Sequence, residues 1–189
     1  SKKLNLTTPD PLDLHRTLAE LSSANYEYVA IEASSHGIDQ YRLDGVRLTA
    51  AAFTNLTRDH LDYHETESQY FSAKKRLFKK LLPPEGTAVL NADSPYYHEM
   101  RDLCRQAGHI ISSYGENSSD IRIDDLLPTQ NGLRICVTIS QRSYETHLPL
   151  VGSFQAYNVL SALGLVMGCG APIEEAFSVL SDLTGVRGR

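Results

Sequence analysis

Apolar and polar residues succeed one another along this chain in blocks that predict alternating strands and helices. Short apolar runs over residues 28–31 and 50–53 have the length and composition of buried parallel strands. Similar runs over residues 87–90 and 109–114 predict two more strands. The spacing of apolar positions predicts helices over three further stretches, residues 11–22, 66–82 and 95–107. This order of elements is typical of a parallel sheet flanked by helices.

The pattern changes in the second half of the chain, where apolar residues alternate with polar ones in a way that predicts antiparallel strands. Three runs alternate in this way, residues 121–126, 133–139 and 144–150. Asn131-Gly132 lies between the first two runs and is a strong hairpin signal. Two helices are predicted after them, residues 155–167 and 173–183. The predicted fold class is therefore α/β: a mostly parallel Rossmann-like sheet flanked by helices, with a small antiparallel sheet in the second half.

Composition narrows the class of protein. The 189 residues are 41% apolar and 22% charged, which fits a globular domain of this size. The net charge of -5 disfavours nucleic acid as a partner, because phosphate binding needs clustered Lys and Arg. The basic cluster at residues 74–80 falls on a predicted helix, where a solvated face is the ordinary interpretation. The three cysteines are far apart, and no apolar run reaches the length of a membrane span. We therefore expect a cytoplasmic protein with no membrane partner.

Two polar clusters, residues 32–36 and 55–62, follow the first two predicted strands. Open α/β sheets bind ligands at the carboxyl ends of their strands, so both clusters are candidates for one site. Glu32 offers a hard carboxylate oxygen of the kind that Mg²⁺ prefers, although such a carboxylate also commonly pairs with arginine or caps a turn. His60 stands among acidic residues, where an imidazole can bind a metal. A loop histidine with no metal is an equally consistent interpretation of His60.

Three further features have both a functional and a structural interpretation. Residues 34–37 form a polar turn that can bind an oxyanion through hydroxyls and backbone N–H groups, but serine also commonly caps helices. Gln40 and Arg42 follow this turn, and an arginine matches a carboxylate or phosphate, although a lone surface arginine is common. Lys74 is predicted to lie two turns into a helix, where its spacing alone does not distinguish it from an exposed lysine.

One familiar nucleotide-binding signature is missing. The chain contains no Gly-Lys dipeptide and therefore no G-x-x-x-x-G-K-[ST] phosphate loop. The chain begins with serine and ends at Gly188-Arg189, soon after a predicted helix. We expect both ends to continue in a longer protein. If that protein uses ATP, its phosphate loop lies outside these residues.

Two long strings resemble those of the Mur ligases, the ATP-dependent enzymes that build the peptidoglycan stem peptide. Residues 32–42 read E-x-S-S-H-G-x-x-Q-x-R, and residues 54–64 read T-N-L-[ST]-R-D-H-L-D-Y-H. Shorter matches follow in the family's order over nearly the whole chain: Thr7-Thr8-Pro9, Ala73-Lys74, Asn91-Ala92-Asp93, Gly152 with Phe154 and Asn158, and Gly188-Arg189. The chain resembles the central domain, and it is most similar to the members that add a diamino acid to UDP-N-acetylmuramoyl-L-alanyl-D-glutamate.

The resemblance implies a role for each matching residue. Five residues would bind the UDP-muramoyl-dipeptide: Thr7, Thr8, Ser34, Gln40 and Arg42. Glu32, His60 and Lys74 would bind Mg²⁺, with Lys74 carried as an N-carboxylated lysine, and His60 and Lys74 would serve catalysis. Asn158 would lie near the adenine of ATP, and Arg189 would contact the nucleotide.

The resemblance also implies how the protein is organised and what it does. Residues 1–189 would be one truncated ligase domain, with a phosphate-loop unit upstream of Ser1 and an amino-acid-binding domain beyond Arg189. Gln155 departs from the family, which often has asparagine there, and this leaves the adenine contacts open. The implied reaction uses ATP and Mg²⁺ to join diaminopimelate or lysine to the muramoyl dipeptide through an acyl phosphate, in a monomeric full-length protein.

Two alternatives stay open. One is a folylpolyglutamate synthetase-like ligase acting on a folate, which the string at residues 34–42 disfavours. The other is a binding-only module, in which the 189 residues alone hold the muramoyl dipeptide but are inactive.

Overall fold

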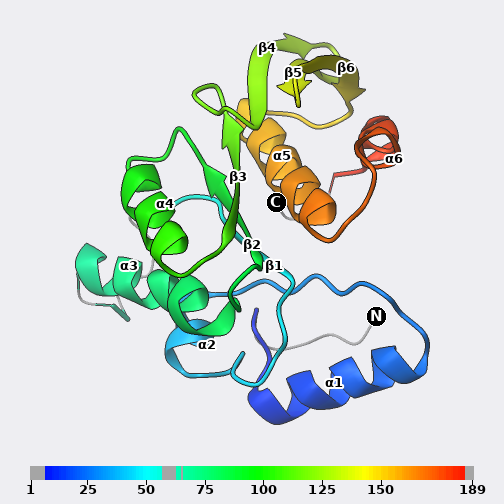
Figure 1. Ribbon diagram of the computed structural model, residues 1–189. Helices are drawn as coiled ribbons and strands as arrows, with labels where there is room; N and C mark the ends of the chain where they lie inside the picture. The colour runs from blue at the N-terminus through cyan, green and yellow to red at the C-terminus, as the bar shows by residue number, and fades with distance from the viewer. Residues whose placement is uncertain (1–6, 57–62, 65, 186–189) are drawn as a thin grey trace. The chain divides into compact units, whose positions relative to one another are not determined.

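The computed structural model describes residues 7–56, 63–64 and 66–185 (Figure 1). The chain divides into two compact units. The first unit comprises residues 1–48 and 56–83, and the second unit comprises residues 49–55 and 84–189. Within the described residues, no helix has the length and apolar character needed to cross a bilayer.

The first unit is helical in its described part. It contains α1 (Pro11–Ser23), α2 (Ser35–Asp39), α3 (Glu67–Arg76) and a π-helical turn (Leu77–Leu81). Asp10 begins α1 by accepting hydrogen bonds from the N–H groups of Leu12 and Asp13, as an N-cap aspartate before a proline should. Thr66 caps α3 in the same way through the N–H of Gln69. The helix predicted over residues 66–82 is thus confirmed, except that its last turn widens into a π-helix.

The prediction of a strand over residues 28–31 is wrong. These residues have no strand assignment, and Tyr28 and Val29 are 69% and 47% exposed. Apolar composition is not enough for a strand, because backbone N–H and C=O groups need a neighbouring strand as a partner. None of the strand pairs among the described residues includes this segment.

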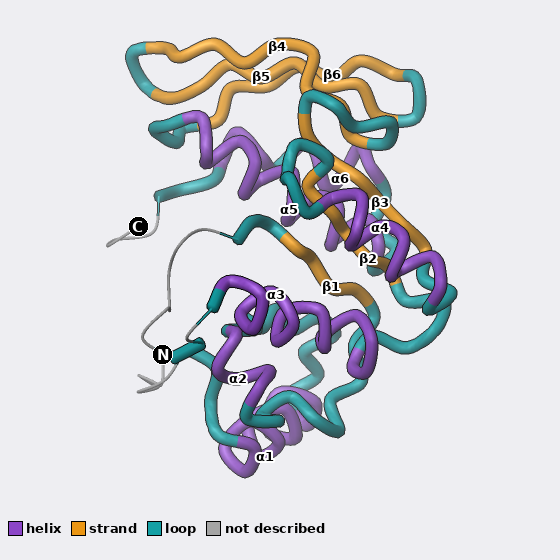
Figure 2. Tube along the Cα trace, turned by 90° about the vertical axis from the view of Figure 1, so that its left-hand side faces the viewer, coloured by secondary structure: helices purple, strands orange, loops and turns teal. Residues whose placement is uncertain are grey.

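The second unit contains a six-stranded sheet in the order β1-β2-β3-β4-β5-β6 (Figure 2). Its strands are β1 (Ala50–Phe53), β2 (Thr87–Asn91), β3 (Ile110–Gly115), β4 (Ile121–Thr129), β5 (Gly132–Ile139) and β6 (Arg142–Leu148). The first four are mutually parallel, whereas β4, β5 and β6 pair antiparallel. The predicted fold class and the hairpin at Asn131-Gly132 are confirmed.

Helices α4 (Tyr97–Gln106) and α5 (Ser153–Gly168) cover opposite faces of β2 and β3 (Figure 1). Strand β2, which pairs with β1 and β3, is accordingly buried on both faces, with Ala88, Val89 and Leu90 fully inaccessible. Gly164 brings α5 close to the sheet, since a Cβ there would lie 2.7 Å from a methyl of Val89. A strand that is buried on both faces has a continuous run of apolar residues, and this run is the feature from which β2 was predicted.

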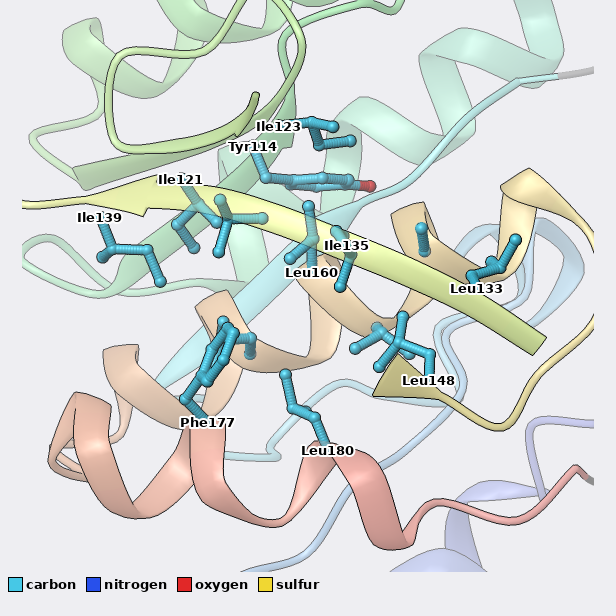
Figure 3. Close-up of a cluster of buried hydrophobic side chains, with 14 of the residues drawn as sticks. Tyr114, Ile121, Ile123, Leu133, Ile135, Ile139, Leu148, Leu160, Phe177 and Leu180 are labelled. Carbon is cyan, nitrogen blue, oxygen red and sulfur yellow. The ribbon is translucent and has the colours of Figure 1, made fainter. Parts of the chain in front are cut away.

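A second layer of core lies between the antiparallel strands and the C-terminal helices (Figure 3). Inward-facing residues of β4, β5 and β6, such as Ile121, Ile135 and Leu148, meet Leu160 of α5. The helix α6 (Ile173–Ser178) and the 3-10 turn (Leu180–Asp182) add Phe177 and Leu180 to this cluster. The strands show the alternation expected of a sheet packed on one face.

Candidate functional site

Thr8 organises the start of the polar turn after residue 32. Its buried hydroxyl donates to the carbonyl of Glu32 over 2.7 Å and accepts from the N–H of Ser34 over 3.0 Å. The hydroxyl of Ser34 lies 2.9 Å from that of Thr8 and accepts from the N–H of Gly37. Ser34 is therefore the N-cap of α2, which confirms the capping interpretation of this serine. A Cβ on Gly37 would come within 2.6 Å of Thr8, so glycine permits this close approach.

Arg42 joins the predicted substrate residues to one another. One of its guanidinium nitrogens donates to the backbone carbonyl of Thr8 over 2.8 Å, and another donates to the side-chain oxygen of Gln40. Ser34 is also hydrogen-bonded to Thr8. Hydrogen bonds within the first unit therefore connect four of the five residues expected to bind the muramoyl dipeptide: Thr8, Ser34, Gln40 and Arg42. The fifth, Thr7, is the exposed neighbour of Thr8.

Two residues that the sequence analysis did not single out complete this cluster. The hydroxyl of Tyr63 donates to the carboxylate of Asp39 over 2.9 Å and accepts from the side-chain nitrogen of Gln40 over 3.3 Å. The ring of His36 lies 4.0 Å from the ring of Tyr63, centroid to centroid. Tyr63 is part of the 54–64 string, but neither apolar periodicity nor motif chemistry indicates a contact with residues 24 positions earlier.

Lys74 is half-buried on α3, so the solvent-exposed interpretation of this residue is wrong. Burial lowers the pKa of its amine, and the nearby carboxylate of Glu32 opposes this shift. Its Nζ also lies 5.8 Å from the centroid of the Tyr70 ring. Lys79 and Lys80, by contrast, are exposed, so the solvated-face interpretation of the basic cluster holds only for part of it. The first unit thus brings Glu32 within electrostatic range of Lys74.

Two of the predicted site residues, His60 and Arg189, lie outside the described residues. Within the part of the chain that the structure describes, no group of three His, Cys, Asp or Glu residues could hold a metal ion. The exposed carboxylate of Glu32 supplies one hard oxygen, and Mg²⁺ often takes only one or two protein carboxylates beside water and substrate phosphates. The donor chemistry near Lys74 therefore fits Mg²⁺ better than zinc, which prefers nitrogen and sulfur.

A pocket of about 370 Å³ lies within the second unit, at the carboxyl ends of β1, β2 and β3. It is lined by residues that follow or end these strands and by the first turns of α5: Thr54, Asn55, Asn91, Tyr114, Ser153, Phe154, Tyr157 and Asn158. Asn158, the predicted adenine residue, is exposed there and donates to the side-chain oxygen of Gln155 over 3.2 Å. Thr54 and Asn55, which directly follow β1, therefore line a concave surface at the strand ends, as expected for a ligand site in an α/β sheet.

Asp93 fixes the loop that follows β3 and also contacts the pocket residue Tyr157. Its carboxylate accepts hydrogen bonds from the N–H groups of Glu116 and Asn117 and from the hydroxyl of Tyr157. Burial raises the pKa of Asp93, but the hydrogen bonds from Asn117, Glu116 and Tyr157 outweigh burial, and the net pKa is lowered. Burial and the adjacent Asp93 raise the pKa of Tyr157. Asp93 of the Asn91-Ala92-Asp93 string therefore has a structural role, because it holds the loop after β3 to α5.

Known proteins are similar to this chain in sequence and in fold. It is 46% identical over 185 residues to the UDP-N-acetylmuramoyl-L-alanyl-D-glutamate--2,6-diaminopimelate ligase of Rhizobium meliloti, with 98% of this chain and 38% of that protein covered. The ligase of the same name from Brucella melitensis is 44% identical over the same shares. The chain thus spans about two fifths of the length of these curated relatives.

Solved structures agree. A structure of a UDP-N-acetylmuramoyl-L-alanyl-D-glutamate--2,6-diaminopimelate ligase superposes with a TM-score of 0.87 at 31% identity, covering 95% of this chain and 37% of that one. The MurF ligase of Thermotoga maritima in complex with ADP shares the fold, with a TM-score of 0.68 at 16% identity over 86% of this chain and 38% of that one. Residues 2–166 match the Mur ligase middle domain. The chain therefore belongs to the Mur ligase middle domain family.

Proposed function

We propose that the full-length protein is an ATP-dependent ligase that joins a diamino acid to UDP-N-acetylmuramoyl-L-alanyl-D-glutamate in peptidoglycan synthesis. The observation that carries this proposal is the linked cluster of Thr8, Ser34, Gln40 and Arg42 in a chain this similar to ligases of that name. Diaminopimelate is favoured over lysine because the curated relatives are named for it. We further propose that the protein acts as a cytoplasmic monomer.

The first unit would hold the muramoyl dipeptide. Arg42 provides a guanidinium that matches a carboxylate or phosphate of this polyanionic substrate. Gln40 is exposed and offers its amide beside the guanidinium, and Thr7 offers an exposed hydroxyl at the other end of the cluster. The hydroxyls of Thr8 and Ser34 are engaged with each other and with backbone groups, so we assign them chiefly to shaping the turn.

Glu32, His60 and Lys74 would hold Mg²⁺, which supplies charge neutralisation for the phosphate and the reacting carboxylate. A lysine ammonium repels a cation, so Lys74 serves here only as a carbamate. The lowered pKa of Lys74 favours this, because a neutral amine adds to carbon dioxide and releases a proton. The product is an anion with two oxygens where the ammonium stood.

The pocket of the second unit would take the adenine of ATP, with Asn158 beside it and Arg189 contacting the nucleotide. A carboxylate is a poor acylating agent at neutral pH, and transfer of the γ-phosphoryl group converts it into an acyl phosphate. The incoming amine then displaces phosphate through a tetrahedral intermediate. In this reaction class the protein mainly positions groups and balances charge.

The proposal is tested by incubating the full-length protein with ATP, Mg²⁺, UDP-N-acetylmuramoyl-L-alanyl-D-glutamate and diaminopimelate or lysine. We expect ADP and phosphate release that requires the muramoyl dipeptide and is faster with diaminopimelate. Release that requires a folate and glutamate instead would favour the folylpolyglutamate synthetase alternative. Turnover by the 189 residues alone would reject the view that they form only a binding module.

A further inference from the structure

We infer that Tyr63 and Asp39 are positioning residues that fix Gln40 and Arg42 in the orientation that binds the muramoyl dipeptide. This inference rests on the proposed function and deepens it, because it explains how the substrate cluster of the first unit is preorganised. Both residues lie in that unit, Asp39 at the end of α2 and Tyr63 shortly before α3.

The hydrogen bonds around Tyr63 have a defined direction. A carboxylate only accepts, so the single proton of the Tyr63 hydroxyl is donated to Asp39 over 2.9 Å. The hydroxyl oxygen is then an acceptor, and the side-chain nitrogen of Gln40 donates to it over 3.3 Å. This leaves the amide oxygen of Gln40 as the acceptor for the guanidinium of Arg42. The chain Asp39–Tyr63–Gln40–Arg42 therefore selects one of the two orientations of the Gln40 amide.

The opposite orientation of the amide would be unfavourable. It would point the NH₂ group of Gln40 at the donors of Arg42 and leave the guanidinium without this acceptor. The second donor of Arg42 is held by the carbonyl of Thr8 over 2.8 Å, so the guanidinium is anchored on two sides. Long flexible side chains lose rotamer freedom on binding, and fixing them beforehand reduces that cost.

The ring of Tyr63 is held independently of its hydroxyl. Its centroid lies 4.0 Å from that of His36 and 4.7 Å from that of His64, which meets it edge-on. His64 is buried and stacks on Tyr70 of α3 at 5.2 Å. Removing the hydroxyl alone should therefore leave the ring in place, and this makes the hydrogen-bond role separable from the packing role.

The experiment measures binding of UDP-N-acetylmuramoyl-L-alanyl-D-glutamate to the full-length protein by calorimetry. For Tyr63→Phe we expect the Kd to rise about five- to tenfold, the size of effect expected from one lost positioning hydrogen bond, with KM for ATP and the thermal midpoint unchanged. Tyr41→Phe is the matched control. It removes the same atom from an exposed tyrosine that lies between Gln40 and Arg42 in sequence and whose ring packs on Arg76. We expect it to bind like the wild type.

A double-mutant cycle identifies the route of the effect. If Tyr63 acts through Gln40, Tyr63→Phe will add almost nothing to the Kd of Gln40→Ala. Asp39→Asn keeps an acceptor for the phenol and should bind better than Asp39→Ala. Additive effects in the cycle, or an unchanged Kd for Tyr63→Phe, would overturn the inference alone. A wild-type protein that does not bind the muramoyl dipeptide would overturn the proposed function itself.

Discussion

Replacing Lys74 by alanine in the full-length protein is expected to reduce the ligation rate by about 100- to 1,000-fold while leaving the fold intact. The residue is half-buried beside the carboxylate of Glu32, in a place where its lowered pKa favours carbamate formation. Lys74→Arg should be equally inactive, because it keeps the positive charge but cannot be carboxylated. The rate is measured as ADP release with all substrates saturating.

Lys79→Ala is the matched control for this prediction. It removes an exposed amine from the π-helical turn that directly follows α3, and we expect normal turnover. A correctly folded Lys74→Ala protein with wild-type turnover would contradict the assignment of Lys74 to the reaction.

Replacing Gly132 by alanine is expected to lower the free energy of unfolding by about 3 kcal/mol. Gly132 begins β5 directly after the turn that joins it to β4, and it has a φ of 145°. A Cβ there would collide with the backbone carbonyl oxygen of Leu148, at the end of β6. Because backbone atoms of a paired strand cannot move aside as a side chain can, the change should loosen the β4–β6 layer and the core that packs on α5.

Urea denaturation followed by circular dichroism checks this prediction through the midpoint of the transition. Gly185→Ala is the control, since a Cβ on Gly185 would meet nothing within 4 Å. Equal midpoints for the Gly132→Ala and Gly185→Ala proteins would show that the strand junction tolerates a side chain.

The parts of the fold that the sequence predicted are those governed by local rules. The alternation in β5 and the Asn131-Gly132 turn identify a hairpin because side-chain period and turn chemistry are both local properties. The segment over residues 28–31 consists entirely of apolar residues, as β1 does, yet only β1 is a strand. What distinguishes them is a backbone partner, β2 in the case of β1, and a partner is not encoded in the segment itself.

The residues of the candidate site likewise fall into those that a sequence motif indicates and those that depend on contacts between distant parts of the chain. Arg42 and Gln40 were found because a family string marks them, and Lys74 was found for the same reason. Tyr63 and Asp39 were missed because their importance comes from contacts across 24 positions of sequence, which no spacing rule predicts. The lowered pKa of Lys74 likewise depends on burial by the surrounding fold and not on its neighbours in sequence.

We propose that Glu32, His60 and Lys74 hold one metal ion at the reacting end of the muramoyl dipeptide. The most direct measurement is a crystal structure of the full-length protein with Mn²⁺, a non-hydrolysable ATP analogue and the muramoyl dipeptide, in which the metal is located by its anomalous scattering. We expect a metal peak within bonding distance of Glu32 and His60, beside a carbamate on Lys74. A metal peak bound by other residues, with Lys74 an unmodified amine far from it, would show that these three residues do not form the metal site.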